Sequence, residues 1–117
     1  MGDNSTLSPE VFATLVAHFV ELARDRRARI AALRKGLDNG KLSVECVREF
    51  ESICHALHGS AGMFGFPEIG AVAEEAEHLC EAARKGAPNL ARIAQALDKL
   101  CAMIDRLDSD AHPVVAS

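Results

Sequence analysis

The stretch from Cys54 to Phe66 reads CHALHGSAGMFGF and combines a helical pattern with residues that weaken a helix. An apolar side chain recurs every three or four positions, at Cys54, Leu57, Ala61 and Phe64, which gathers them on one face of a helix. The same stretch holds three glycines, and each glycine inside a helix costs about 1 kcal/mol relative to alanine. The sequence therefore predicts a helix with a buried face, in which the glycines serve a purpose that outweighs their cost.

The same periodicity predicts further helices on both sides of this stretch. One helical region covers about 9–37, where the charged run Arg24 to Arg29 leaves open whether there is one helix or two. The helix carrying the opening stretch covers 44–64, and two more cover 67–85 and 89–107. Ser8, Ser43 and Asn89 stand where helix N-caps are expected, because their side-chain oxygens can accept from free backbone N–H groups.

Each predicted helix carries an apolar face that it cannot bury alone. The side chains expected to point inward are Phe12, Leu15, Val16, Phe19, Val20, Ala23, Ile30, Leu33 and Leu37 in the first region, Val47, Phe50, Cys54, Leu57, Ala61 and Phe64 in the second, Ile69, Val72, Ala76, Leu79, Cys80 and Ala83 in the third, and Ile93, Leu97, Leu100, Cys101, Ile104 and Leu107 in the last. Packing these faces around one core predicts an all-α fold, an antiparallel four-helix bundle with an additional N-terminal helical segment. We expect one domain over 1–117, with the bundle at about 9–107 and a flexible tail at 109–117.

Composition narrows the classes of function. The chain has 117 residues, 49% of them hydrophobic and 26% charged, with a formal net charge of −4 and no basic patch, so nucleic acid is not an expected partner. It shows no apolar run near the ~20 residues of a membrane span and no signal-peptide layout, so we expect a cytoplasmic protein that does not bind membranes. The four cysteines form no CxxC pair, which favours free thiols over a zinc site or disulfides.

A helical wheel separates the two histidines of the opening stretch from the core. With about 100° per residue and Phe50 at zero, His55 falls at about 140° and His58 at about 80°. Gly59 and Gly62 share the outward sector with His55. Glycine at i+4 leaves the imidazole accessible and lets another protein approach. Close packing between helices is the alternative explanation for these glycines, and it fits the outward-facing Gly59 poorly.

The wheel by itself is compatible with an ordinary surface histidine. The chain contains no nucleophile elbow, phosphate-binding glycine loop or HExxH motif. The chemistry open to an exposed imidazole is that of a nucleophile or of a general acid or base. Because a small bundle offers no evident cleft, we expect its reaction partner to be carried by another macromolecule.

The run from His55 to Phe66 resembles the motif of histidine phosphotransfer (HPt) domains of two-component phosphorelay signalling. That motif reads His-x-Leu/Ile-Lys-Gly-Ser/Gly, then small residues, then Phe/Leu-Gly-Phe/Ala, and here it is HALHGSAGMFGF. The segment from Leu79 to Arg84, LCEAAR, is also similar to the next helix of the family. Helix number, order and length agree with the family over about 9–107.

The resemblance implies that His55 is the phosphoacceptor of a phosphoryl carrier rather than of an enzyme. It would receive the group from a receiver-domain phosphoaspartate or a kinase and pass it to another receiver. The partners implied are response-regulator receiver domains, a hybrid histidine kinase, or both, and the receiver would supply Mg²⁺ and the acidic pocket. No cofactor and no metal are expected on the chain itself. Since one bundle uses all the apolar faces, we expect a monomer.

The resemblance also implies roles for residues around His55. Glu77 would orient the imidazole by accepting its Nδ1 proton, although it is also one of several acidic residues on its helix. The expected docking face comprises Glu51, Ser52, Gly59 and Gly62. His58 departs from the family, which has lysine at this position. At pH 7 a histidine with the ordinary pKa of about 6.5 is mostly neutral, so we expect phosphotransfer to depend on pH more strongly than with lysine, or to be weakened.

Two other functions remain open on the sequence. A metal-binding bundle is suggested by Glu75-x-x-His78 and by Glu51, His55 and His58, which could share a face, but a di-iron site needs two Glu-x-x-His motifs and two more inward glutamates. A degenerate or phosphate-independent interaction module, in which the glycine-lined face docks a partner helix, is harder to separate from phosphotransfer.

Overall fold

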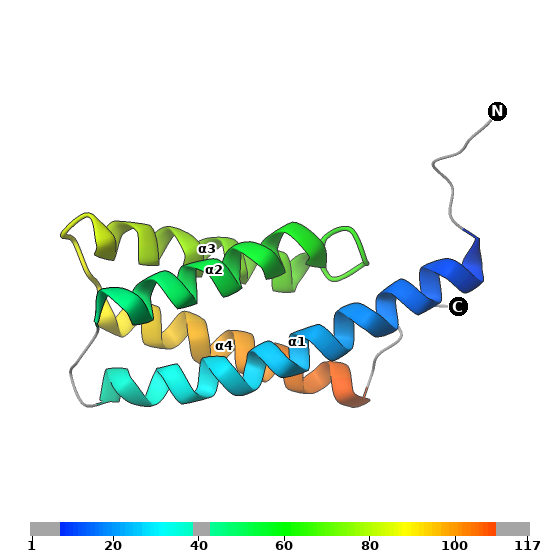
Figure 1. Cartoon of the computed structure of the whole chain (residues 1–117), viewed down its shortest axis with the longest axis horizontal. Helices are drawn as coiled ribbons and strands as arrows, with labels where there is room; N and C mark the ends of the chain where they lie inside the picture. Colours follow the sequence, from blue (N-terminus) through cyan, green and yellow to red (C-terminus); the bar gives the residue numbers. More distant parts are fainter. Residues whose placement is uncertain (1–7, 39–42, 110–117) are drawn as a thin grey trace.

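The computed structural model describes residues 8–38 and 43–109 and arranges them as four helices in an up-and-down order. The helices are α1 (Pro9–Asp38), α2 (Val44–Ala61), α3 (Pro67–Arg84) and α4 (Leu90–Ser109). Successive helices run in opposite directions, and α1 lies beside α4 while α2 lies beside α3 (Figure 1). The predicted all-α antiparallel bundle is therefore confirmed. The expected tail at 109–117 lies outside the described residues from 110 onward, and Ser109 is the last residue of α4.

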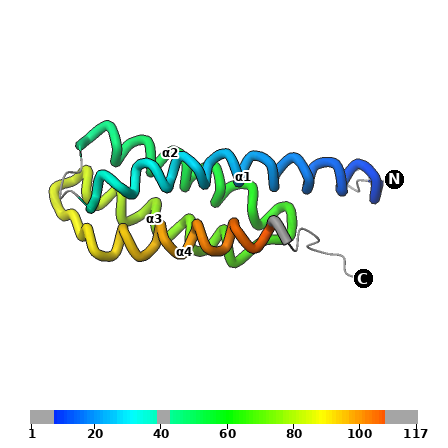
Figure 2. Tube along the Cα trace, turned by 90° about the horizontal axis from the view of Figure 1, so that it is seen from below, coloured from blue at the N-terminus to red at the C-terminus, as the bar shows by residue number. Residues whose placement is uncertain are grey.

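The first helical region is one continuous helix of 30 residues. The charged run Arg24 to Arg29 stays helical because arginine favours helices and no proline or glycine interrupts it. The additional N-terminal segment is thus the first part of α1, which extends past the end of the other three helices (Figures 1 and 2). Leu15 is expected in the core and is instead exposed. Phe12, Val16 and Phe19 around it on α1 pack in or against the core, so Leu15 lies at the edge of the buried stripe.

Side-chain caps begin three of the helices where the sequence places them. The Ser8, Ser43 and Asn89 side-chain oxygens each accept a backbone N–H at 3.1 Å, from Val11, Cys46 and Arg92 respectively. Residues 39–42, between α1 and α2, lie outside the described residues. The local capping rules thus hold for α1, α2 and α4.

The helix α2 ends at Ala61, three residues earlier than the apolar stripe predicted. Gly65 has a φ of 93°, and the Phe66 N–H donates to the Ala61 carbonyl at 2.8 Å, as in a Schellman turn. The turn places Phe64 and Phe66 against Phe19, with ring centroids 5.9 and 5.4 Å apart. These aromatic contacts close one end of the core.

The core runs along the whole bundle and contains most of the side chains predicted for it. Its largest fully buried members are Ile30, Phe50, Leu57, Ile93, Leu97, Leu100 and Ile104. Five side chains that the sequence predicts inside are only partly buried at the edge of the core, namely Phe12, Phe64, Leu79, Ala83 and Cys101. All four cysteines are free, with Cys54 and Cys80 buried.

Arginine–carboxylate pairs link every neighbouring pair of helices around the bundle. They are Arg29–Glu49 between α1 and α2, Arg84–Glu51 between α2 and α3, Arg92–Glu75 between α3 and α4, and Arg27–Asp105 and Arg34–Asp98 between α1 and α4. The pairs at Arg27, Arg29, Arg34 and Arg84 use two nitrogen–oxygen contacts each, a geometry that the planar guanidinium favours. Exposed pairs contribute little stability individually, so their main effect is on which helices meet and in which register.

Candidate functional site

His55 stands on the surface of α2 in the middle of the α2–α3 face. Its side chain is 74% exposed, in agreement with its place on the helical wheel. The neighbouring residues on the apolar side, Cys54 and Leu57, are fully buried and fix the rotation of α2 about its own axis. The imidazole therefore projects from a helix anchored in the core, while the ring itself is open to solvent.

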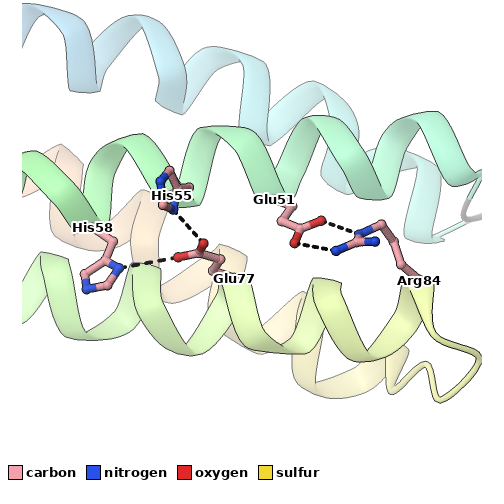
Figure 3. Close-up of polar contacts among 5 residues, drawn as sticks. All are labelled: Glu51, His55, His58, Glu77 and Arg84. Carbon is pink, nitrogen blue, oxygen red and sulfur yellow. Dashed lines mark hydrogen bonds and ion pairs between the residues drawn. The ribbon is translucent and has the colours of Figure 1, made fainter.

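Glu77 on α3 contacts the imidazole of His55 across the helix interface. The Nδ1 atom of His55 lies 2.7 Å from Oε2 of Glu77, whose side chain is only 20% exposed (Figure 3). A carboxylate that is ionised can only accept hydrogen bonds, so this contact places the proton on Nδ1. In a neutral ring with this tautomer, Nε2 keeps its lone pair.

The same carboxylate also faces the second histidine of α2. The Nδ1 atom of His58 lies 3.4 Å from Oε1 of Glu77, and the His58 side chain is 41% exposed. Figure 3 shows the carboxylate between the two imidazoles, with one oxygen turned toward each. The structure thus brings together the three residues for which the sequence predicts direct roles in transfer.

Gly59 and Gly62 are exposed, and no backbone requirement explains them. Neither has a positive φ, and a Cβ atom at either position would have nothing within 4 Å. Close helix packing therefore does not account for them. Gly70 on α3 does fit that explanation, because it is buried and a Cβ there would lie 3.7 Å from the Cβ of Ala61. The signal for Gly70 in the sequence is a glycine inside the apolar face of 67–85, which indicates close packing.

Glu51, which the sequence assigns to the docking face, forms an ion pair with Arg84 of the neighbouring helix. Nε and Nη2 of Arg84 donate to its two carboxylate oxygens at 2.6 and 3.0 Å (Figure 3). Hydrogen bonding to Glu51 raises the pKa of the Arg84 guanidinium. Sequence reasoning missed Arg84 as a neighbour of the site, because pairing between helices depends on their relative register and not on spacing along the chain.

The surface around His55 is a shallow depression rather than a cleft. It is lined by Arg48, Glu51, Ser52, His55, Glu77 and Arg84. Ser52 is exposed and also lines a second depression on the α1 side of α2. A small molecule would gain little enclosure here, whereas a protein surface could cover the whole depression.

The two buried thiols beneath this surface, Cys54 and Cys80, are unreactive near neutral pH. Burial raises the pKa of Cys54 and of Cys80 to about 12 in each case. Thiolate is the reactive and metal-binding form of cysteine, so neither thiol is a nucleophile near neutral pH.

Metal-ligating side chains do not converge in the part of the chain that the structure describes. Across 8–38 and 43–109, no group of three or more His, Cys, Asp or Glu side chains could hold a metal ion. Within the motif considered for a metal site, Glu75 is paired with Arg92 and His78 is exposed on α3. Among the described helices, none combines the length and the apolar character needed to cross a membrane.

Comparison with protein-family models gives a match to the Hpt domain over residues 14–110. The chain belongs to the Hpt domain family. The match covers all four helices, including most of α1, and agrees with the resemblance found in the sequence. A comparison with curated proteins finds no match, and a comparison with solved structures finds none either. Membership of the Hpt family associates the chain with histidine phosphotransfer in phosphorelay signalling, as a phosphocarrier module that interacts with receiver domains and histidine kinases.

Proposed function

We propose that the chain, acting as a single Hpt domain, accepts a phosphoryl group on Nε2 of His55 and passes it on. The donor is a receiver-domain phosphoaspartate or a histidine kinase, and the acceptor is the aspartate of another receiver. The observation that supports this most directly is an exposed imidazole whose Nδ1 is held by a carboxylate from the neighbouring helix. Such a ring has its nucleophilic nitrogen available to a partner and needs no base to remove a proton first.

The transfer step balances without any further reactant. The lone pair on Nε2 attacks phosphorus, the bond between phosphorus and the aspartate oxygen breaks, and the aspartate leaves as a carboxylate. The Nδ1 proton stays on the ring, which becomes a phosphorylated imidazolium. Glu77 lies 2.7 Å from Nδ1 and stabilises that positive charge as it develops. The reverse step returns the phosphoryl group to a second receiver by the same route.

In this proposal the receiver domain provides the remaining groups needed for transfer. Phosphoryl transfer depends on in-line positioning and on charge stabilisation around the phosphoryl oxygens. In this proposal the receiver supplies Mg²⁺ and its acidic pocket, while the bundle supplies the oriented nucleophile. The chain therefore acts as a carrier.

Open space around the ring supports docking on the α2 face. Gly59 lies one turn beyond His55, Gly62 one turn beyond His58, and a side chain at either position would project into empty space. Ser52 is exposed on the opposite side of His55, and Glu51 holds Arg84 at the edge of the same depression. We assign these residues to the surface that a receiver covers during transfer.

Mixing the chain with receiver domains phosphorylated by radiolabelled acetyl phosphate tests the proposal. We expect label on the chain that is labile in acid and stable in base, and that is absent from His55→Gln. A His18→Gln variant is the matched control, because His18 is an exposed histidine on α1, far along the chain from this site. Binding of receivers without any label on wild-type chain would instead favour the phosphate-independent interaction module.

A further inference from the structure

His55 and His58 stand in the same local arrangement, displaced by three residues along α2. Each ring has Nδ1 turned toward an oxygen of Glu77, at 2.7 Å for His55 and 3.4 Å for His58. Each also has a glycine one helical turn later, Gly59 for His55 and Gly62 for His58, with nothing within 4 Å of the place a Cβ would take. Both side chains reach solvent, 74% and 41% exposed respectively.

These observations give His58 a chemical property that the family's lysine lacks at this position. A lysine at this position could only donate hydrogen bonds or contribute charge, whereas an imidazole with its proton on Nδ1 offers a lone pair on Nε2. The carboxylate has two oxygens, so Glu77 can hold the Nδ1 proton of both rings at the same time (Figure 3).

We propose that His58 is a second phosphoacceptor of this site, oriented by the same carboxylate as His55. This inference rests on the function proposed above and adds a second modified residue to it. The Nε2 lone pair of His58 attacks phosphorus, the bond from phosphorus to the donor's leaving group breaks, and the proton on Nδ1 stays beside Glu77. His55 is the faster acceptor, because its contact with Glu77 is shorter and its ring is more exposed.

Phosphoramidate tests the proposal without requiring a cognate receiver. In this reaction the imidazole attacks phosphorus, the nitrogen–phosphorus bond of the reagent breaks, and ammonia leaves. Peptide mass spectrometry under alkaline conditions then measures the label on each histidine separately. His18 and His78 serve as controls inside the same molecule, because both are exposed and neither is hydrogen-bonded to a carboxylate among the described residues.

We expect His58 to be labelled faster than His18 and His78, and about tenfold slower than His55, the factor expected when one hydrogen bond of ordinary strength is weakened. His55→Gln should keep the label on His58. Glu77→Ala should reduce the labelling of His55 and His58 to the level of His18 while leaving His18 itself unchanged. Circular dichroism of each variant verifies that the bundle is folded.

The outcomes separate this inference from the proposed function. If His55 is labelled rapidly while His58 matches His18 and His78, His58 is not a second acceptor and the proposed function stands. If neither His55 nor His58 exceeds the control histidines, His58 is not a second acceptor oriented by Glu77, and the experiment with radiolabelled receivers decides the proposed function separately. Nitrogen-15 NMR gives a second readout, since His58 should carry its proton on Nδ1, and a proton on Nε2 would overturn the inference.

Discussion

Glu77 on α3 lies with Oε2 2.7 Å from Nδ1 of His55 on α2, and an ionised carboxylate in this position favours the tautomer with its proton on Nδ1. Cys80, one turn further along α3, is buried against the core and fixes the rotation of α3, so Glu77 faces α2 without entering the apolar interior. The Glu77 side chain is only 20% exposed, while the His55 side chain is 74% exposed. An exposed ring is thus held by a largely buried carboxylate on the neighbouring helix.

Removing the carboxylate should slow phosphoryl acceptance by His55. We expect Glu77→Ala to reduce the transfer rate by roughly ten- to a hundredfold, because a hydrogen bond to a charged group contributes about 1.5–3 kcal/mol. Glu77→Gln should lose less, since an amide oxygen can still accept from Nδ1 without supplying negative charge. Rates from a phosphorylated receiver, measured together with thermal unfolding, test this. Equal rates for wild type and both variants would show that Glu77 does not orient the ring.

Restoring lysine at position 58 should change the pH dependence of transfer. A histidine changes charge between about pH 5 and 8, whereas lysine stays cationic across that range. We therefore expect the rate of His58→Lys to vary less between pH 6 and 8 than the wild-type rate. The measurement is the rate of label transfer to His55 at a series of pH values. An unchanged profile in the variant would rule out a contribution from the charge of residue 58.

Adding a side chain at Gly59 should affect the stability of the fold and the rate of transfer differently. Gly59→Ala adds a methyl group to empty space in a helical conformation, so we expect the free energy of unfolding to rise by roughly 0.5–1 kcal/mol. Gly59→Leu should keep the fold and slow transfer from a receiver, because the larger side chain lies one turn from His55. Urea unfolding and transfer rates test the two halves. A Gly59→Leu variant with wild-type transfer would show that the receiver does not approach over Gly59.

The cysteines should react in the order of their burial. Because the pKa of Cys54 and Cys80 is raised to about 12, we expect iodoacetamide at pH 8 to modify Cys46 first and these two only after unfolding. The folded state holds the thiol protons more tightly than the unfolded chain, where the ordinary value is 9.0. Stability should therefore fall as the pH rises from about 9 to about 12. Rapid modification of Cys54 in the native protein would contradict this.

The N-cap of α2 should matter for stability although it is far from the site. The Ser43 hydroxyl accepts the Cys46 N–H at 3.1 Å, so Ser43→Ala should lower the free energy of unfolding by about 1 kcal/mol. Ser43→Gly should lower the free energy of unfolding by only a few tenths of a kcal/mol. Ser52→Ala is the control, since Ser52 is an exposed serine inside the same helix. Equal destabilisation by Ser43→Ala and Ser52→Ala would remove the cap as the cause.

Much of the fold could be predicted from local rules. Apolar spacing located all four helices, and caps such as Ser43 marked where they begin. The Hpt resemblance was carried by one short run of residues, and the family match confirms it. The exposure of His55 followed from the wheel, because the burial of Phe50 and Leu57 dictates which way the rest of α2 faces.

The sequence by itself determined what depends on neighbours along one chain: the helices, their buried faces, and two histidines with glycines one turn beyond each. Only the tertiary structure decided what depends on register between helices. It placed Glu77 between His55 and His58, paired Glu51 with Arg84, and left Leu15 exposed at the edge of the buried stripe of α1. The physical reason is that periodicity fixes the direction of a side chain around its own helix. The relative shift of two helices along their axes is set by the packing of all four.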